Sequence, residues 1–260
     1  MSEHDPADSR RRTILRRMGV DVWVRRDAVT AATESPVEAP APESPAPPQN
    51  PEVTSAAAPA TRADTDVASM DWPDLEAAVS GCTLCELCHS RTQTVFGVGR
   101  RDADIMVIGE APGAEEDRQG EPFVGRAGQL LDNMLRALGY GREQVFIANI
   151  LKCRPPRNRD PEPGEAAACW PYLARQIALV EPRVILAVGR IAAQNLLDSD
   201  KPLRMLRRQV HTVAPAGIPV VVSYHPAYLL RSPADKAKAW ADLKRLRDYL
   251  PSPAGAEERA

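Results

Sequence analysis

A short apolar run that ends abruptly in glycine and proline constrains this chain more than any other feature. Residues 105–109 are apolar, and Glu110-Ala111-Pro112-Gly113 follows at once. The run is brief, contains β-branched residues and is bounded by residues that break regular structure, which predicts a buried strand. In open α/β sheets, ligands bind at the carboxyl ends of the strands. The sequence therefore predicts a ligand-binding loop after this strand, with a plain connecting loop as the alternative.

Strand-like and helix-like segments alternate from residue 103 onward. Such alternation is typical of a parallel sheet with helices on both faces. We therefore expect an α/β domain of three layers (αβα) around a central, four-stranded, mainly parallel sheet. Strands are expected at 105–109, 145–150, 184–188 and 220–223, and helices at 72–80, 127–138, 165–180, 191–197 and 234–249.

Composition divides the chain before this domain. Residues 28–70 are rich in Ala, Pro, Glu, Ser and Thr. They cannot bury enough apolar surface to offset the entropy of ordering, so we expect a disordered linker. The basic segment 1–27 is compatible with contact to DNA, contact to a partner or packing on the domain. The folded domain is expected at 71–250 and a disordered tail at 251–260.

The chain lacks features of a membrane or secreted protein. No apolar run is long enough to span a bilayer, and the N-terminus lacks the apolar core of a signal peptide. A cytoplasmic monomer is therefore expected.

The five cysteines point to metal or redox chemistry rather than to a disulfide framework. Cys82 and Cys85 form a C-x-x-C pair, and fifteen residues separate Cys153 from Cys169. Two such pairs can hold Zn²⁺ or an iron–sulfur cluster, and the spacing alone does not decide between them. The alternative is that Cys169 is a small buried side chain and Cys153 a loop thiol.

Polar side chains follow three of the expected strands. Glu110, Asn149 and His225 would meet at one edge of a parallel sheet, with Phe123 in a glycine-rich loop nearby. We expect Phe123 to be exposed and to offer a stacking surface. A carboxamide carries a donor and an acceptor side by side, and together with an aromatic ring it suits recognition of a flat base. Neither a phosphate-binding P-loop nor a dinucleotide-binding glycine motif is present.

Basic residues cluster near these loops, among them Arg154, Arg157 and Arg159. They are compatible with a patch that follows a phosphate backbone, and equally with an ordinary solvated surface.

Four motifs follow one another along the chain: 109–117 (GEAPGAEED), 122–128 (PFVGRAG), 149–156 (NILKCRPP) and 225–230 (HPAYLL). In sequence and in order they resemble the family-4 uracil-DNA glycosylases, which carry a [4Fe-4S] cluster. The resemblance covers about residues 78–250 and leaves the N-terminal third outside. It implies the uracil-DNA glycosylase fold and removal of uracil from single- or double-stranded DNA in base excision repair, leaving an abasic site.

The resemblance also implies roles for single residues. Cys82, Cys85, Cys153 and Cys169 match the cluster ligands, which leaves Cys88 as an extra thiol, although Cys85 and Cys88 also form a C-x-x-C pair.

In the pocket, the resemblance gives Phe123 the stacking role and Asn149 the reading of uracil, beside the substrate loop of Ala111, Pro112 and Gly113. His225 matches the histidine that stabilises the departing base, and Glu110 and Glu116 match the motif carboxylates. Glu116 is also a candidate for excluding the methyl group of thymine. At the DNA surface, the resemblance implies Tyr228, Leu229, Leu230 and Arg231 on a loop that enters the minor groove, and the clustered charges add Arg154, Arg157 and Arg159 as candidate DNA contacts.

One departure from the wider superfamily concerns the attacking water. Better-known uracil glycosylases carry an aspartate where this chain has Ala111, which leaves the residue that activates water undetermined. We expect a dissociative reaction in which the glycosidic bond breaks first. No lysine stands at the predicted site, so a monofunctional enzyme without strand-cleaving activity is expected.

Two other functions stay open at this point. One is a nucleic-acid-binding module without catalysis, and the other is a protein that remains covalently attached to uracil-containing DNA. His225 and Asn149 favour the enzyme, and residues 120–131 lack the insertion of the related crosslinking class.

Overall fold

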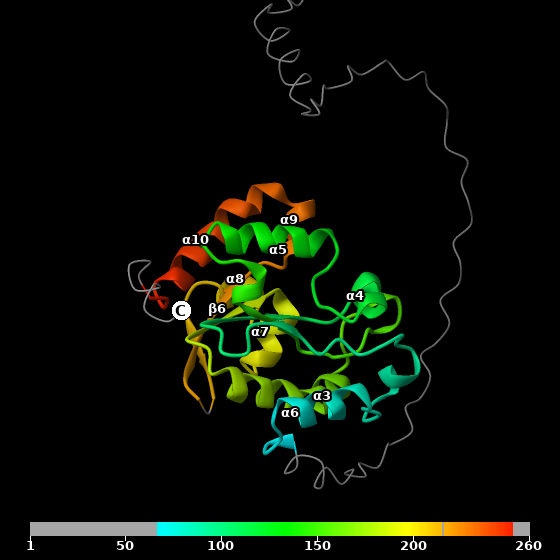
Figure 1. Cartoon of the computed structure of the whole chain (residues 1–260). Helices are drawn as coiled ribbons and strands as arrows, with labels where there is room; N and C mark the ends of the chain where they lie inside the picture. Colours follow the sequence, from blue (N-terminus) through cyan, green and yellow to red (C-terminus); the bar gives the residue numbers. More distant parts are fainter. Residues whose placement is uncertain (1–66, 215, 252–260) are drawn as a thin grey trace, which may run out of the picture. The chain divides into compact units, whose positions relative to one another are not determined.

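A six-stranded β-sheet forms the centre of the computed structural model, which describes residues 67–214 and 216–251 (Figure 1). The strand order is β1-β3-β2-β4-β6-β5. The four central strands run parallel, and each edge strand is antiparallel to its neighbour. The strands are β1 (Val98–Gly99), β2 (Ile105–Gly109), β3 (Phe146–Asn149), β4 (Val184–Val188), β5 (His211–Val213) and β6 (Ile218–Ser223).

The four predicted strands make up the parallel centre of this sheet, so the predicted α/β class is confirmed. The two antiparallel edges extend it. β1 lies in the segment 94–99, whose sequence TVFGVG is typical of a short strand or hairpin arm, but β5 was not predicted. It is only three residues long, and Val213 is its single buried residue, so its sequence carries too little apolar pattern to be recognised.

Helices cover both faces of the sheet (Figure 1). One layer contains α5, α9 and α10, and the opposite layer contains α6 and α7, with α3 packed on α6. The α-helices are α3 (Trp72–Ser80), α4 (Ala114–Gln119), α5 (Arg126–Arg136), α6 (Pro163–Val180), α7 (Arg190–Leu196), α8 (Leu203–Leu206), α9 (Pro226–Arg231) and α10 (Lys236–Arg247). The 3₁₀ turns are η1 (Glu86–His89), η2 (Arg142–Gln144), η3 (Pro156–Asn158) and η4 (Pro233–Asp235).

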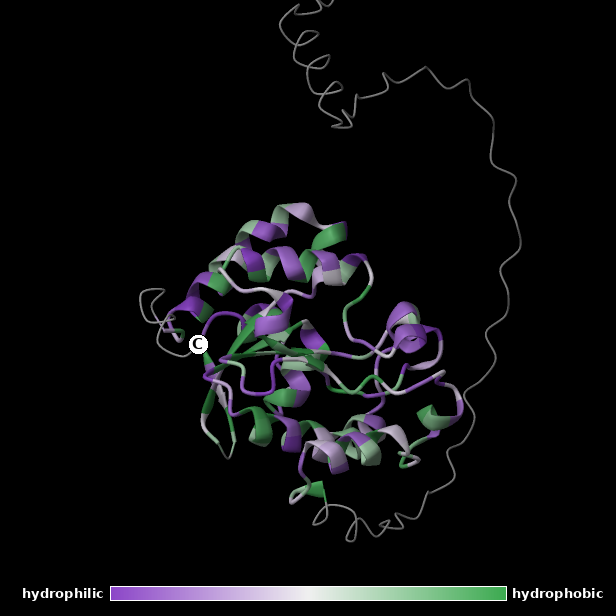
Figure 2. Ribbon diagram, viewed as in Figure 1, coloured by the Kyte–Doolittle hydropathy of each residue, from purple (hydrophilic) through white to green (hydrophobic). Residues whose placement is uncertain are grey.

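The apolar strands are buried because both of their faces are covered. In β2, Ile105 and Val107 pack with the core under α5 and α10, whereas Met106 and Ile108 pack with the core under α6 and α7. Successive strand residues point to opposite faces, so a strand covered twice becomes apolar throughout. Figure 2 shows this as hydrophobic residues concentrated in the central strands, while the surrounding helices alternate between hydrophilic and hydrophobic.

Local sequence signals mark both ends of α3. The Asp71 carboxylate accepts a hydrogen bond from the Asp74 N–H at 3.1 Å, and Gly81 follows the end of α3, as predicted. The last helix begins at Lys236 rather than at Ala234, because Pro233–Asp235 forms the separate turn η4. The short helices α4 and α8 were not predicted.

The folded part begins earlier than expected. Val67 is buried and packs with Leu75, Val79 and Tyr172, and the Met70 carbonyl accepts a hydrogen bond from Arg175 at 2.6 Å. Residues 67–70 therefore belong to the domain rather than to the predicted linker. The predictions for the basic segment 1–27, for the rest of the linker and for residues 252–260 lie outside the described residues.

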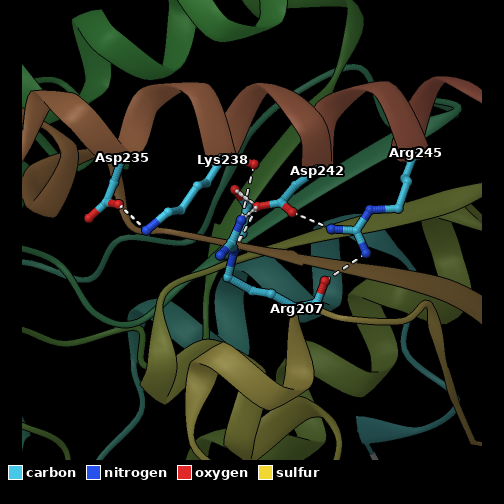
Figure 3. A network of polar contacts seen from close by, with 6 residues as sticks. Arg207, Asp235, Lys238, Asp242 and Arg245 are labelled. Carbon is cyan, nitrogen blue, oxygen red and sulfur yellow. Dashed lines mark hydrogen bonds and ion pairs between the residues drawn. The ribbon is translucent and has the colours of Figure 1, made fainter.

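A buried carboxylate ties α10 to the sheet (Figure 3). Asp242 is fully buried and accepts hydrogen bonds from Ser223 at the end of β6 (2.9 Å) and from Arg207 (2.8 Å). Arg245 forms an ion pair with the other carboxylate oxygen and also donates to the Arg207 carbonyl at 2.6 Å. The guanidinium of Arg207 lies 3.9 Å from the centroid of the Tyr224 ring, directly before His225 in the chain. This network therefore fixes the segment that leads into the predicted catalytic motif.

Replacing Asp242 by alanine should destabilise the domain strongly. The change leaves two arginines without their buried partner, and breaking such a pair typically costs about 3–5 kcal/mol. Urea denaturation measures the loss in the free energy of unfolding. The control is Asp248→Ala, an exposed carboxylate just beyond α10, which should change stability by roughly 0.5 kcal/mol or less. Equal small effects of the two changes would contradict the assigned role of the network.

Candidate active site

The parallel register brings the ends of the central strands to one edge of the sheet. Gly109 of β2 pairs with Asn149 of β3, and Val188 of β4 pairs with Ser223 of β6. Glu110 therefore follows directly beside Asn149, and His225 follows two residues after Ser223. The residues at this edge surround a pocket whose empty volume, part of it open to solvent, is about 1140 Å³.

All eight residues predicted to bind or act on the substrate line this pocket. They are Glu110, Ala111, Pro112, Gly113, Glu116, Phe123, Asn149 and His225. Four lining residues were not predicted individually, although all but Asn158 lie within the motifs 122–128, 149–156 and 225–230. These are Ala127, Pro155, Asn158 and Ala227.

Asn149 carries a buried polar atom that the protein does not satisfy. Its side chain is buried at the end of β3, and Oδ1 has no hydrogen-bond partner among the residues that the structure describes. Leaving such an atom unpaired costs about 1–3 kcal/mol. The backbone of the same residue is held firmly, because buried Lys152 donates to the Asn149 carbonyl at 3.0 Å and to Gln176 at 2.6 Å. A fixed and unsatisfied carboxamide in a pocket is suited to reading a ligand.

The prediction of an exposed Phe123 is wrong. Phe123 is 6% exposed, and its ring stacks on the His225 imidazole with 5.6 Å between centroids and 28° between planes. The ring also lies over Gly109, where an added Cβ would come within 2.6 Å of the ring and would collide with the Asn149 carboxamide. Glycine at this position therefore allows the ring and the carboxamide to share the pocket.

His225 is held as a neutral ring that presents its Nε2 atom. Its Nδ1 accepts a hydrogen bond from the Ala227 N–H at 3.2 Å, so in the neutral ring the proton resides on Nε2. The pKa of His225 is lowered to about 4, mainly by burial and also by the nearby Arg231 charge, against the opposing effect of Glu116. At neutral pH the side chain is therefore an uncharged hydrogen-bond donor.

Glu110 titrates far above an ordinary glutamate. Burial raises its pKa to about 7, and the charge of Asp160 acts in the same direction, while Arg190 opposes them. Arg190 and Asp160 themselves form an ion pair of 2.6 Å. Near neutral pH the Glu110 carboxyl group can therefore either hold or release a proton.

Glu116 uses both carboxylate oxygens on the backbone. One oxygen accepts from the Gly113 N–H at 3.1 Å, and the other accepts from the Val124 and Gly125 N–H groups at 3.0 and 3.3 Å. It therefore joins the loop after β2 to the loop that carries Phe123.

The five cysteines gather around one small cavity. Cys82, Cys85 and Cys88 come from the segment around η1, Cys153 follows β3, and Cys169 lies on α6. Arg91 also lines this cavity and donates to the Cys153 Sγ at 3.1 Å. Within residues 67–214 and 216–251, no three Cys, His, Asp or Glu side chains converge as ligands for a single metal ion.

The residues predicted to contact DNA divide into two groups. Arg159, Tyr228 and Arg231 line the pocket. Arg159 forms two hydrogen bonds with Glu165, at 2.6 and 2.8 Å. Arg154 and Arg157 lie outside the pocket, where Arg154 donates to Asn158 at 2.8 Å.

The predicted minor-groove loop is a helix, α9, and the prediction for Leu229 conflicts with its position. Leu229 is 1% exposed and packs in the core with Leu131 and Leu243, so it cannot reach a groove. On a helix only one face is free, and the apolar pattern of this motif did not reveal which residue points inward. Leu230 is half-buried, and the hydroxyl of Tyr228 donates to Asp235 at 2.6 Å.

Comparison with known proteins identifies the family. Residues 96–244 match the family described as "Uracil DNA glycosylase superfamily". The chain belongs to this superfamily.

Curated relatives narrow the assignment. The chain is 42% identical over 179 residues to the type-4 uracil-DNA glycosylase of Archaeoglobus fulgidus. The aligned region covers 66% of this chain and 90% of the relative. It is 41% identical to the enzyme of that name from Thermotoga maritima (66% and 91%) and 42% identical to that from Pyrobaculum aerophilum (67% and 92%). Within the superfamily, the chain is a member of the type-4 uracil-DNA glycosylases, as its motifs predicted.

Within the part of the chain that the structure describes, every helix is too short or too polar to cross a membrane.

The raised pKa of Glu110 can be measured without any assay of activity. A carboxyl carbon titration by NMR should show a midpoint near pH 7. Asp160→Asn removes a charge that raises this pKa and should move the midpoint to lower pH, whereas Arg190→Gln removes an opposing charge and should move it to higher pH. A midpoint near 4.5, the ordinary value for glutamate, would contradict the described environment.

Proposed function

We propose that this chain is a monofunctional glycosylase that hydrolyses the N-glycosidic bond of uracil in DNA and leaves an abasic site. The observation that carries the proposal is the buried, unpartnered Asn149 Oδ1 in a pocket shared with Phe123 and a neutral histidine. The named activity of the type-4 relatives supports the same function.

Asn149 is suited to distinguish uracil from cytosine. A carboxamide can accept from uracil N3–H through Oδ1 and donate to O4 through Nδ2, whereas cytosine presents the reversed pattern. The wrong base would leave buried polar atoms unpaired, at about 1–3 kcal/mol for each atom. Stacking of the base on Phe123 would contribute roughly 1–3 kcal/mol more.

His225 would stabilise the departing base. In the dissociative reaction that we propose, the glycosidic bond breaks first and the electron pair remains on uracil as an anion. The neutral ring donates a hydrogen bond from Nε2 toward the developing charge on O2, which lowers the barrier while the proton stays on Nε2.

Glu110 would act on the sugar side of the reaction. Its ionised carboxylate can stabilise the positive charge that develops on the sugar and position the water that adds afterwards. Because its pKa lies near 7, this help should increase as the pH rises through neutrality. Glu116, bound to three backbone N–H groups, would shape the wall that excludes thymine.

The pocket opening supplies candidate contacts to single- or double-stranded DNA. Arg231 lines the pocket and provides positive charge there, Arg159 lines it while paired with Glu165, and Arg154 and Arg157 lie outside the lining. Tyr228 and Leu230 of α9 are the proposed minor-groove contacts. The protein is also proposed to act as a monomer.

Lys152 is not proposed as a nucleophile, although burial lowers its pKa to about 7. Its amino group is engaged by the Asn149 carbonyl and by Gln176, and it does not line the pocket. The proposed enzyme therefore lacks strand-cleaving activity.

The shared cysteine cavity fits a [4Fe-4S] cluster better than a single ion. A tetrahedral zinc site needs all of its sulfurs about 2.3 Å from one point, and no three of the described thiols converge in that way. We assign Cys82, Cys85, Cys153 and Cys169 as the ligands. The cluster would act structurally, because it would connect the segment before β1 to the loop after Asn149 and to α6.

Excision from a uracil-containing oligonucleotide tests the function. Alkali should cut the product at uracil, and no cut should appear before alkali is added. His225→Ala should reduce the single-turnover rate by about 10²–10³-fold, and Asn149→Ala by about 10–100-fold. Asn133→Ala, on the exposed side of α5, is the matched control and should act like the wild type. A protein that carries its cluster but releases no uracil would contradict the proposal and favour a DNA-binding module. A protein–DNA crosslink that survives denaturation would instead favour covalent attachment.

Iron and sulfide analysis of protein purified without air tests the cluster and its ligands. Cys153→Ser and Cys169→Ser should lose iron, because each removes a thiolate that no neighbour replaces. Cys82→Ser should also lose iron, whereas Cys88→Ser should retain it. The reverse result for Cys82 and Cys88 would move the ligand pair to Cys85 and Cys88, and zinc without iron would contradict the cluster.

A further inference from the structure

The loop that carries Phe123 has an unfavourable backbone conformation. Phe123 has φ = 54°, in the left-handed region that residues other than glycine rarely adopt. Its carbonyl also lies against the first turn of α5, so closely that any side chain at Gly128 would collide with it. A side chain in this conformation needs neighbours that hold it there, and such strain is common at functional sites.

Arg142 holds the carbonyl side of this loop. It lies on η2, before β3, and donates hydrogen bonds to the Phe123 carbonyl at 3.2 Å and to the Pro122 carbonyl. Asp132 of α5 orients the guanidinium through a contact of 3.3 Å. Both side chains are 24% exposed, which limits screening by solvent. The planar guanidinium can bind two consecutive carbonyls at once, which an ammonium group cannot do with the same geometry.

Glu116 holds the other side of the same loop. Its carboxylate accepts from the Val124 and Gly125 N–H groups. A cation therefore binds the two carbonyls before the turn, and an anion binds the two N–H groups after it. The ring between these anchors lies over Gly109 and stacks on His225.

We infer that Arg142, oriented by Asp132, is a positioning residue for the Phe123 ring. Arg142 does not line the pocket among the described residues, so it acts on a bound base only through Phe123. This inference rests on the proposed function, in which uracil stacks on that ring. Without Arg142, the loop can relax from the left-handed conformation, and the ring moves away from His225 and from the base.

A double-mutant cycle separates positioning from general stabilisation. Single-turnover excision is measured for the wild type, Arg142→Ala, Phe123→Ala and the combined variant. Arg142→Ala should lower the rate by about 10–100-fold, because a misplacement of about 1 Å at a reacting centre has effects of this size. In the Phe123→Ala background the same change should have almost no further effect, since the ring that it positions is gone.

Two further variants distinguish loss of positioning from general loss of stability. Arg142→Lys keeps the charge but loses the paired hydrogen bonds, and it should show an intermediate loss of rate with a melting temperature close to the wild type. Arg136→Ala removes an exposed arginine of α5 whose side chain donates a hydrogen bond to Asn133, and it should leave the rate unchanged.

The outcomes distinguish this inference from the proposed function. An active wild type with an unimpaired Arg142→Ala variant would overturn the inference alone. Equal losses in the two backgrounds would also overturn it, because Arg142 would then act independently of Phe123. A wild type that carries its cluster but does not excise uracil would overturn the proposed function and this inference with it.

Discussion

The close approach of three groups at Gly109 is the constraint on which the rest of the site depends. The parallel register of β2 and β3 sets Gly109 beside Asn149, and the missing side chain at Gly109 leaves room for the Phe123 ring. Glu116 binds backbone groups of the loop after β2 and of the loop that carries Phe123, and Arg142 binds the Phe123 loop from the other side. The pocket is thus assembled from strand register, one glycine and two charged side chains that bind backbone groups.

Burial shifts the pKa values of His225 and Glu110 in opposite directions. It lowers the pKa of His225 to about 4 and raises that of Glu110 to about 7, because burial disfavours the charged form of either group. The result is a neutral hydrogen-bond donor at His225, which we propose faces the departing base, and a carboxyl group at Glu110 that titrates near neutral pH and that we propose acts on the sugar. A charged imidazole would bind the uracil anion more strongly, but burial in this pocket makes that charge costly.

Much of this arrangement could be predicted from sequence because it depends on local patterns. Apolar runs ending in glycine located β2 and β4, and the polar residues at the carboxyl ends of β2, β3 and β6 identified Glu110, Asn149 and His225. The remainder depends on tertiary contacts. Phe123 is buried by stacking on a residue a hundred positions away, and Leu229 is inward because α9 packs on α5. Arg142 resembles any surface arginine until the fold places Pro122 and Phe123 beside it.

The central claim is that Asn149 reads uracil, and NMR of its side-chain amide tests this most directly. The Asn149→Ala variant assigns the signal, and free uracil or cytosine is then added to the wild type. The account predicts that uracil shifts the Asn149 amide resonances, because both of its polar atoms gain partners, and that cytosine at the same concentration does not. Equal shifts with both bases, or none with uracil while other pocket signals move, would contradict it.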